Sequence, residues 1–325
     1  MQIKRRGACR HGRPLTRRAP LVARRARVAA VAHHISIWVD QRIKPKPEFL
    51  HTLLSYYETQ LWGTDFQNPG LAARQINDWV AYQTRSAIRE LFQPNDFADE
   101  AGSAVLANTL YLDGTWATPF PAANTRPGKF LLETGEEKTV PMMRSEERAL
   151  YYMETQDFQA VGLHYRGEGE RFTFYLFLPR AYQTVDWMRE QWTPENWAKW
   201  RQQFSYQTGT LSLPRFQIQQ HHDDNLQDAL KTMGMEVAFD SERANFSRIA
   251  DITEYQIWIG KVTQRAAIDL NEYGTRAVVS TGGFFEAVPR GRPIRLVVNR
   301  PFLFAIVHEE TGIVLVMGII RDPAP

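Results

Sequence analysis

Cysteine is almost absent from this 325-residue sequence, and the only one, Cys9, has no second cysteine with which to form an intrachain disulfide. A small disulfide-stapled scaffold is therefore excluded. The chain fits either a reducing compartment or a fold large enough to hold without cross-links. Uninterrupted apolar runs of the roughly 20 residues that a membrane-spanning helix needs are also missing. The length allows one large domain or two ordinary ones.

Acidic residues are absent before Asp40, and residues 1–27 carry ten Lys/Arg. The rest of the chain then holds 29 basic against 36 acidic residues, a net charge of −7. A basic arm of this kind can bind nucleic acid or an anionic membrane. This one has no interleaved aromatic residues and no apolar helical stripe, which favours a disordered or non-native segment over residues 1–34. We expect neither a nucleic-acid partner nor a membrane partner.

A secretory signal is a poor fit to the same segment, because arginines interrupt its only apolar stretch, residues 19–32. The compartment stays open: extracellular or periplasmic if a native signal precedes the chain, and otherwise cytoplasmic.

Motifs of known catalytic centres are missing too, including the nucleophile elbow, the phosphate-binding loop and the Gly-rich dinucleotide turn. The densest metal candidate is the run His221-His-Asp-Asp224, which lacks the i, i+4 spacing of helical zinc ligands. Asp223 or Asp224 better serves as a helix N-cap. The sequence therefore predicts no enzyme, no metal site and no cofactor.

The apolar patterns predict helices first and strands later, which is typical of an α+β fold around large mixed sheets. Helical spacing covers 47–57, 68–91 and 225–234, the last with Met233 facing inward. Strand patterns cover 35–39, 104–112, 172–178, 210–218, 257–270, 302–307 and 313–319.

One long connection interrupts this pattern, with roughly two dozen residues between the strand that ends at Leu270 and the core segment that resumes at Asn299. Connections of this length are usually functional or disordered. In its first half every second residue is small or β-branched, so the segment could enter a sheet as a strand with Arg276 directed outward. Gly274 supplies a hinge without a Cβ penalty. The residues on the inward face are Thr275, Ala277, Val279 and Thr281.

The second half of the connection is predicted to be an exposed protease cleavage site, because Val288-Pro289 precedes Arg290-Gly291 in an extended sequence. A trypsin-like pocket with a buried carboxylate accepts such an arginine. The alternative is a surface loop with a chance basic cluster.

Several ordered motifs from about residue 35 to the end resemble the serpin family of serine protease inhibitors. They are Asn108-Thr-Leu-Tyr-Leu-Asp-Gly-Thr-Trp116 with Pro119-Phe120, Thr139-Val-Pro-Met-Met143, Leu213-Pro-Arg-Phe216, Leu230-x-x-Met-Gly234 with Ala238-Phe239, Ala244-x-Phe246-Ser247, and Asn299-Arg-Pro-Phe302 to Gly318.

The resemblance implies a large mixed β-sheet with two further sheets, helices and an exposed reactive-centre loop, in a monomer. It places the serpin domain at 35–325, without the helices that usually precede this point. It also implies inhibition by trapping: a serine protease forms an acyl-enzyme with the bait, and the freed loop inserts into the large sheet as a strand.

The resemblance also implies roles for single residues. The reactive bond is Arg290–Gly291 when matched from the loop's far end to antitrypsin-type members, which favours a trypsin-like target. Counting from Gly274 instead gives Val288–Pro289 and an elastase-like target. The hinge comprises Glu272, Gly274, Thr275, Arg276, Ala277, Val278 and Val279.

Three positions belong to the sheet around this loop. Asn108 is expected at the shutter beneath the sheet, and Trp116 in the breach where the loop enters. Gln264 replaces the family's shutter histidine. Because Val279 is bulkier than the usual alanine and faces inward, insertion is expected to slow, so the alternative function is a non-inhibitory serpin with a substrate-like, binding or chaperone role.

Overall fold

The computed structural model divides into two compact units. The first contains residues 32–111 and 219–267, and the second contains residues 112–218 and 268–325. The structure describes residues 13–14, 29–57, 59–97, 104–167, 171–222, 224–251, 256–275 and 292–323.

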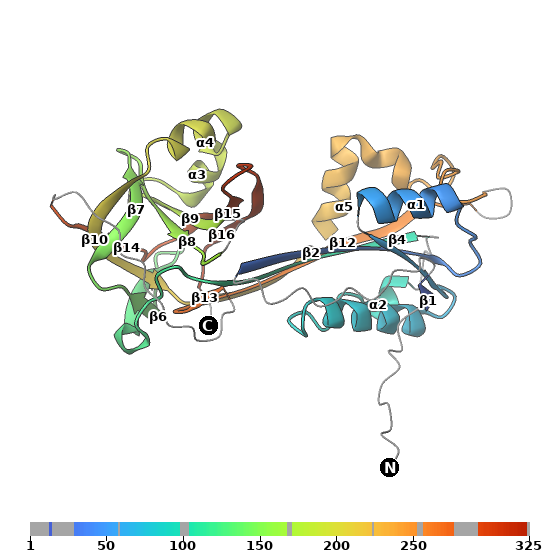
Figure 1. Ribbon diagram of the computed structural model, residues 1–325, viewed down its shortest axis with the longest axis horizontal. Coiled ribbons are helices and arrows are strands. Elements are labelled where there is room, and N and C mark those ends of the chain that lie inside the picture. The colour runs from blue at the N-terminus through green and yellow to red at the C-terminus, as the bar shows by residue number, and fades with distance from the viewer. Residues whose placement is uncertain are drawn as a thin grey trace, which may run out of the picture. The chain divides into compact units, whose positions relative to one another are not determined.

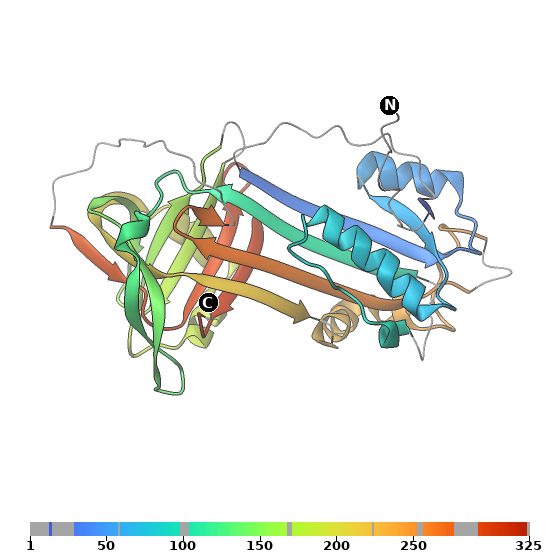
Figure 2. The ribbon, with the colours of Figure 1, turned by 90° about the horizontal axis from the view of Figure 1, so that it is seen from below.

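A seven-stranded sheet has the strand order β1-β3-β2-β4-β13-β12-β11. The strand β2 pairs with β3 in parallel, and β4 pairs with β12 in parallel. Figure 2 shows β2, β4 and β12 side by side. The strands are β1 Arg13–Pro14, β2 Ala29–Asp40, β3 Gln60–Thr64, β4 Ala104–Thr115, β11 Phe216–His222, β12 Ile259–Asn271 and β13 Gly274–Thr275.

Helices cover both faces of this sheet in the first unit, with α2 on one side and α1 and α5 on the other (Figure 1). The alternation of side chains along the strands explains this arrangement. Trp38 of β2 and Trp62 of β3 pack with α2, whereas their neighbours Val39 and Leu61 pack with Leu53 of α1. The helical elements of this unit are α1 Pro47–Tyr56, α2 Pro69–Gln83, η1 Pro94–Phe97, α5 Asp224–Leu230, η3 Lys231–Met235 and η4 Glu236–Phe239.

The helix predicted over 68–91 begins as expected but ends eight residues early, at Gln83. The Asn68 side chain caps it by accepting from the backbone N–H of Leu71. The chain then turns through Arg85 and Ser86, which both have positive φ. Apolar residues beyond the turn, such as Leu91, are still buried, so the apolar spacing continued although the helix did not.

One other expectation in this unit was wrong, that for Met233, and one strand extends beyond its predicted start. The strand β2 begins at Ala29, so it extends six residues into the segment predicted to be disordered or non-native. Met233, predicted to face inward, is 80% exposed because it follows α5 in a π-helical turn in which Gly234 has a φ of 102°.

The second sheet has nine strands and lies entirely in the second unit. The strand β10 links its two halves: residues 205–209 pair with β7 and residues 212–214 pair with β6. The two further sheets expected from the resemblance are therefore continuous through β10. The strands are β5 Arg126–Leu131, β6 Glu137–Arg144, β7 Arg148–Glu154, β8 Phe158–His164, β9 Phe172–Pro179, β10 Ser205–Pro214, β14 Ile294–Val297, β15 Phe302–His308 and β16 Val314–Ile320.

Each face of this sheet has its own apolar core. On one face, α3 Val185–Gln191 and α4 Pro194–Arg201 pack against β9 and β15 through aromatic residues such as Phe177 and Trp200 (Figure 1). The other face forms the larger core, which includes Trp116, Phe174 and Phe304. The mixed α+β fold predicted from the sequence is confirmed.

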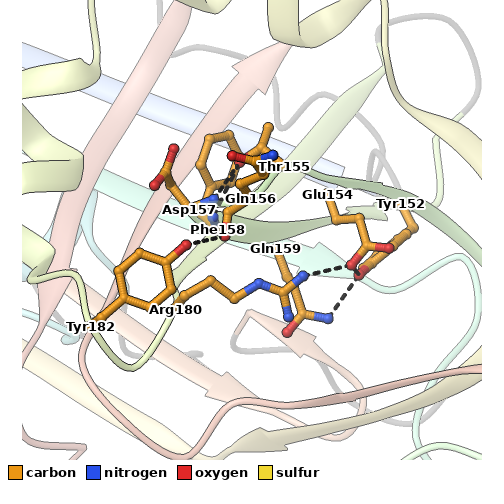
Figure 3. A network of polar contacts seen from close by, with 9 residues as sticks. All are labelled: Tyr152, Glu154, Thr155, Gln156, Asp157, Phe158, Gln159, Arg180 and Tyr182. Carbon is orange, nitrogen blue, oxygen red and sulfur yellow. Dashed lines mark hydrogen bonds and ion pairs between the residues drawn. The ribbon is translucent and has the colours of Figure 1, made fainter.

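A network of polar contacts fixes the β7–β8 hairpin to the end of β9 (Figure 3). The Arg180 guanidinium donates to Glu154 at 2.7 Å, and the Tyr152 hydroxyl donates to the same carboxylate at 3.0 Å. Gln159 donates to the Tyr152 hydroxyl at 2.8 Å, and Tyr182 donates to the backbone carbonyl of Gln156. The strand β7 is thus held at this end, while its other end borders a cavity described below.

Across the described residues, no helix is both long and apolar enough to cross a membrane. The same part of the chain holds no group of three or more His, Cys, Asp or Glu side chains placed to bind a metal ion.

Candidate functional site

The site is built around β13, a strand of only two residues that lies between β4 and β12 in the seven-stranded sheet. Gly274 and Thr275 pair antiparallel with Thr115 and Gly114 of β4, and equally with the last two residues of β12. The segment predicted as the hinge of an inserting loop therefore already forms its first pairs within the sheet.

Gly274 must be glycine at this position. Its φ is 152°, and a Cβ atom placed there would lie 1.9 Å from the backbone oxygen of Gly114. Thr275 is fully buried, and its hydroxyl lies 2.6 Å from the Tyr165 hydroxyl. Burial raises the pKa of Tyr165, so its hydroxyl keeps its proton and either of the two groups can donate.

Glu272 anchors the hinge just before β13, and its side chain is only 2% exposed. Its carboxylate accepts from Arg215 of the β10–β11 junction through both oxygens at 2.6 Å, and from Thr125 at 2.6 Å. Burial alone would raise the pKa of Glu272, but the hydrogen bonds from Thr125, Arg215 and its own backbone N–H outweigh it, so the pKa lies below its usual value.

Trp116 follows β4 and is 1% exposed. Its indole N–H donates to the backbone carbonyl of Asn271 at 3.0 Å, and its backbone N–H donates to the carbonyl of Tyr273 at 2.8 Å. Its ring stacks on Tyr165 with 4.6 Å between ring centroids. We call residues 271–275 together with Trp116, Thr125, Tyr165 and Arg215 the hinge anchor.

Asn108 and Gln264 are direct neighbours in the parallel β4–β12 pairing of the first unit. The Asn108 side-chain oxygen is buried, and no described residue donates a hydrogen bond to it. Gln264 therefore does not donate to the Asn108 side-chain oxygen, although the two residues are paired across the strands.

Several predicted site residues lie outside the described residues. The chain is described again from Arg292, which is exposed, and β14 then pairs in parallel with β10. The residues outside are Arg276, Ala277, Val278, Val279, Val288, Pro289, Arg290 and Gly291.

The sequence did not reveal the partners that complete the hinge anchor. Thr125, Tyr165 and Arg215 lie between 57 and 147 residues from their hydrogen-bond partners in the hinge. Arg215 carried one signal, its place in the motif Leu213-Pro-Arg-Phe216, but nothing linked that motif to Glu272. The complete anchor holds a strand in place, which is a conformational role.

The family model described as Serpin (serine protease inhibitor) matches residues 19–323. This chain belongs to the serpin family. Members of the family are in general protease inhibitors. This serpin is 29% identical to Serpin B10 of Rhinolophus ferrumequinum over 279 residues, which cover 85% of this chain and 69% of that protein.

Solved structures agree with this assignment. Native protease nexin-1 with heparin superposes with a TM-score of 0.77 at 26% identity, covering 90% of this chain and 77% of that one. Human thyroxine-binding globulin superposes with a TM-score of 0.80 at 22% identity, covering 92% and 76%, and supports the fold alone. The serpin fold expected from the sequence motifs is confirmed.

Proposed function

We propose that this serpin inhibits a trypsin-like serine protease as a suicide substrate, with Arg290–Gly291 as the cleaved bond. The protease forms an acyl-enzyme at Arg290, and the released segment after Thr275 inserts between β4 and β12. The protease is carried with the segment and distorted before it can deacylate. The observation that carries this proposal is β13, which already lies between these two strands.

The register of β13 supports the length that insertion requires. Thr275 is opposite Gly114, so continuing the antiparallel pairing along β4 brings Phe285 opposite Ala104, its first residue. Residues 276–285 would thus fill the whole strand, and Arg290 follows five residues later. The inward direction of Thr275 also puts Ala277 and Val279 on the inner face and Arg276 on the outer one.

The balance of backbone hydrogen bonds formed and broken favours the inserted loop over the exposed one. A ten-residue central strand forms about two backbone hydrogen bonds per residue, while roughly one is lost for each β4–β12 pair that opens. Eight such pairs exist, between residues 104–111 and 259–267. The net gain is about a dozen bonds, or roughly 6–18 kcal/mol at 0.5–1.5 kcal/mol each.

The test is to mix the purified protein with trypsin and to run denaturing gel electrophoresis. We expect a covalent band at the summed mass, which the Arg290→Ala variant loses and the Val288→Phe variant keeps, phenylalanine being too large for the small pocket of an elastase. The opposite pattern, with pancreatic elastase as the trapped enzyme, would move the reactive bond to Val288–Pro289. Clean cleavage without a covalent band would refute inhibition by trapping.

A substrate-like, non-inhibitory serpin is the second candidate. It is favoured by the Asn108 side-chain oxygen, which has no hydrogen-bond partner among the described residues, and by the valine at position 279, which is bulkier than the expected alanine. Both would affect the rate at which β4 and β12 separate and the loop inserts. Measuring thermal stability before and after trypsin cleaves the loop distinguishes loop insertion from trapping of the protease. A sharp rise in thermal stability without a covalent band would show a loop that inserts too slowly to trap its protease.

A further inference from the structure

A cavity of about 970 Å³ lies in the second unit, bordered by β7, β8 and the turn after β4. Its volume is at the upper end of the range for pockets that hold small organic ligands. It is lined by residues that include Trp116, Arg148, Tyr151, Tyr165 and Tyr206. The cavity thus combines aromatic surface with a cation, and neither family membership nor the proposed inhibition assigns it a role.

Arg148 is the cation whose charge is left without a counter-ion. Its Nη1 donates to the backbone carbonyl of Thr118 at 2.6 Å, and its guanidinium lies 4.9 Å from the centre of the Phe120 ring. Within the described residues no carboxylate pairs with it, although Glu147 also borders the cavity. Burial lowers the pKa of Arg148 to about 10, which indicates a poorly solvated charge. An anion placed against the guanidinium would compensate for the lost solvation.

The second acid on the wall is already neutralised. Glu309 forms an ion pair with Arg201 at 3.0 Å and accepts a hydrogen bond from Tyr175 at 2.8 Å. Arg166 and Arg171 also border the cavity, so among the described residues of its wall the basic groups outnumber the acids. An anionic ligand is therefore favoured over a cationic one.

Aromatic rings form a second recognition surface. Tyr151 and Tyr206 lie with 5.2 Å between ring centroids, and His164 holds the Tyr206 hydroxyl through its Nε2 at 3.1 Å. Rings fixed in this way favour a flat apolar body, since aromatic pairs pack by stacking or edge contact.

Two residues of the wall belong to the hinge anchor. Tyr165 contacts the Thr275 hydroxyl, and Trp116 holds the Asn271 carbonyl while stacking on Tyr165. A molecule that fills the cavity against these rings restricts their motion and thereby strengthens the anchor.

We propose that this cavity binds a small aromatic anion, a carboxylate or sulfonate, whose charged group pairs with Arg148 and whose ring lies on Tyr151 and Tyr206. Occupancy stabilises the hinge anchor through Trp116 and Tyr165. Binding does not depend on protease inhibition, so the two proposals can fail separately.

Calorimetric titration with naphthalene-2-carboxylate, and with the uncharged naphthalene-2-carboxamide as its matched probe, tests the site. We expect the carboxylate to bind at least about tenfold more tightly, because a hydrogen bond to a charged group contributes that much. The preference should vanish in Arg148→Gln, return in part in Arg148→Lys, and persist in Arg144→Gln, which alters an exposed arginine on β6. Equal affinities in the unmodified protein, or an unchanged preference in Arg148→Gln, would overturn the proposal.

Two further measurements keep the proposal testable. If Arg148→Gln does not fold, Ala149→Phe adds a ring to the cavity wall and should abolish binding of both probes; retained binding would place them elsewhere.

Hydrogen exchange of the 270–275 backbone amides tests the coupling between the cavity and the hinge anchor. The carboxylate should slow this exchange in the unmodified protein and leave it unchanged in Arg148→Gln. Binding without slower exchange would refute the link to the hinge.

Discussion

The ion pair between Glu272 and Arg215 should contribute measurably to the stability of the uncut protein. Glu272→Gln preserves the shape of the side chain and leaves an oxygen to accept from Thr125, but it removes the charge that Arg215 pairs with. A hydrogen bond between charged groups contributes about 1.5–3 kcal/mol. Because the Arg215 side chain is 44% exposed, water solvates it once the partner is gone, so we expect a loss near the lower end, about 1.5–2 kcal/mol.

The assay is thermal unfolding at a fixed scan rate. The entropy of unfolding grows with chain length, and for 325 residues a stability loss of 1 kcal/mol lowers Tm by roughly 1.5 °C. Glu272→Gln should therefore lower Tm by about 2–3 °C. Arg215→Gln should lower Tm more, because it leaves the buried Glu272 carboxylate without its cation, and the double variant should lose less than the sum of the two single losses, because the second change has no pair left to break. The exposed Arg144→Gln is the control and should leave Tm unchanged. Strictly additive losses would refute the ion pair as the source of the effect.

Three further predictions concern the same sheet. Gly274→Ala should prevent β13 from seating, since its Cβ would collide with the Gly114 backbone oxygen; faster hydrogen exchange at 270–275 would show this, and unchanged exchange would contradict it. Because the pKa of Glu272 is lowered by folding, its charge stabilises the protein above the ordinary value of 4.5, and this contribution is lost as the pH falls through the lower folded pKa. The Tm difference between the unmodified protein and Glu272→Gln should therefore be constant above about pH 5.5 and shrink in acid; a difference independent of pH would argue against it. Gln264→His places a ring N–H beside the unpartnered Asn108 oxygen and should raise stability by about 1 kcal/mol, measured as Tm; no gain would mean that the two side chains do not meet.

Much of the fold was predictable because its strands carry strong local patterns. The run Phe172–Pro179 is buried at every position, and its uninterrupted apolar sequence indicated a covered strand. The terminal hairpin was predictable from two apolar runs flanking Glu309-Glu-Thr-Gly312, where Gly312 has a φ of 70°. The end of α2 was not, because Arg85 and Ser86 take positive φ without being glycine, and the apolar spacing continued past them.

The candidate site was only half predictable, for a different reason. Glu272, Gly274 and Thr275 follow one another in sequence, so their pattern marked a hinge. The cavity beside Arg148 left no such pattern, since its wall is collected from β7, β8, β10 and the turn after β4. Arrangements of this kind depend on which strands become neighbours, and single residues do not encode that.

For the proposed insertion, the two residues of β13 would serve as a strand nucleus that exists before cleavage. Starting a new strand is unfavourable because backbone freedom is lost, at about 1–2 kcal/mol per residue, before further pairing compensates. Gly274 and Thr275 have already lost that freedom, so the inserting segment would only extend a strand that is already paired on both sides. The first parallel pair to open ahead of it joins Ala267 to Tyr111, and the last joins Ile259 to Ala104. The proposed insertion would thus proceed in one direction, with the residues beside β13 controlling its rate and those near Ile259 and Ala104 affecting only the stability of the final strand.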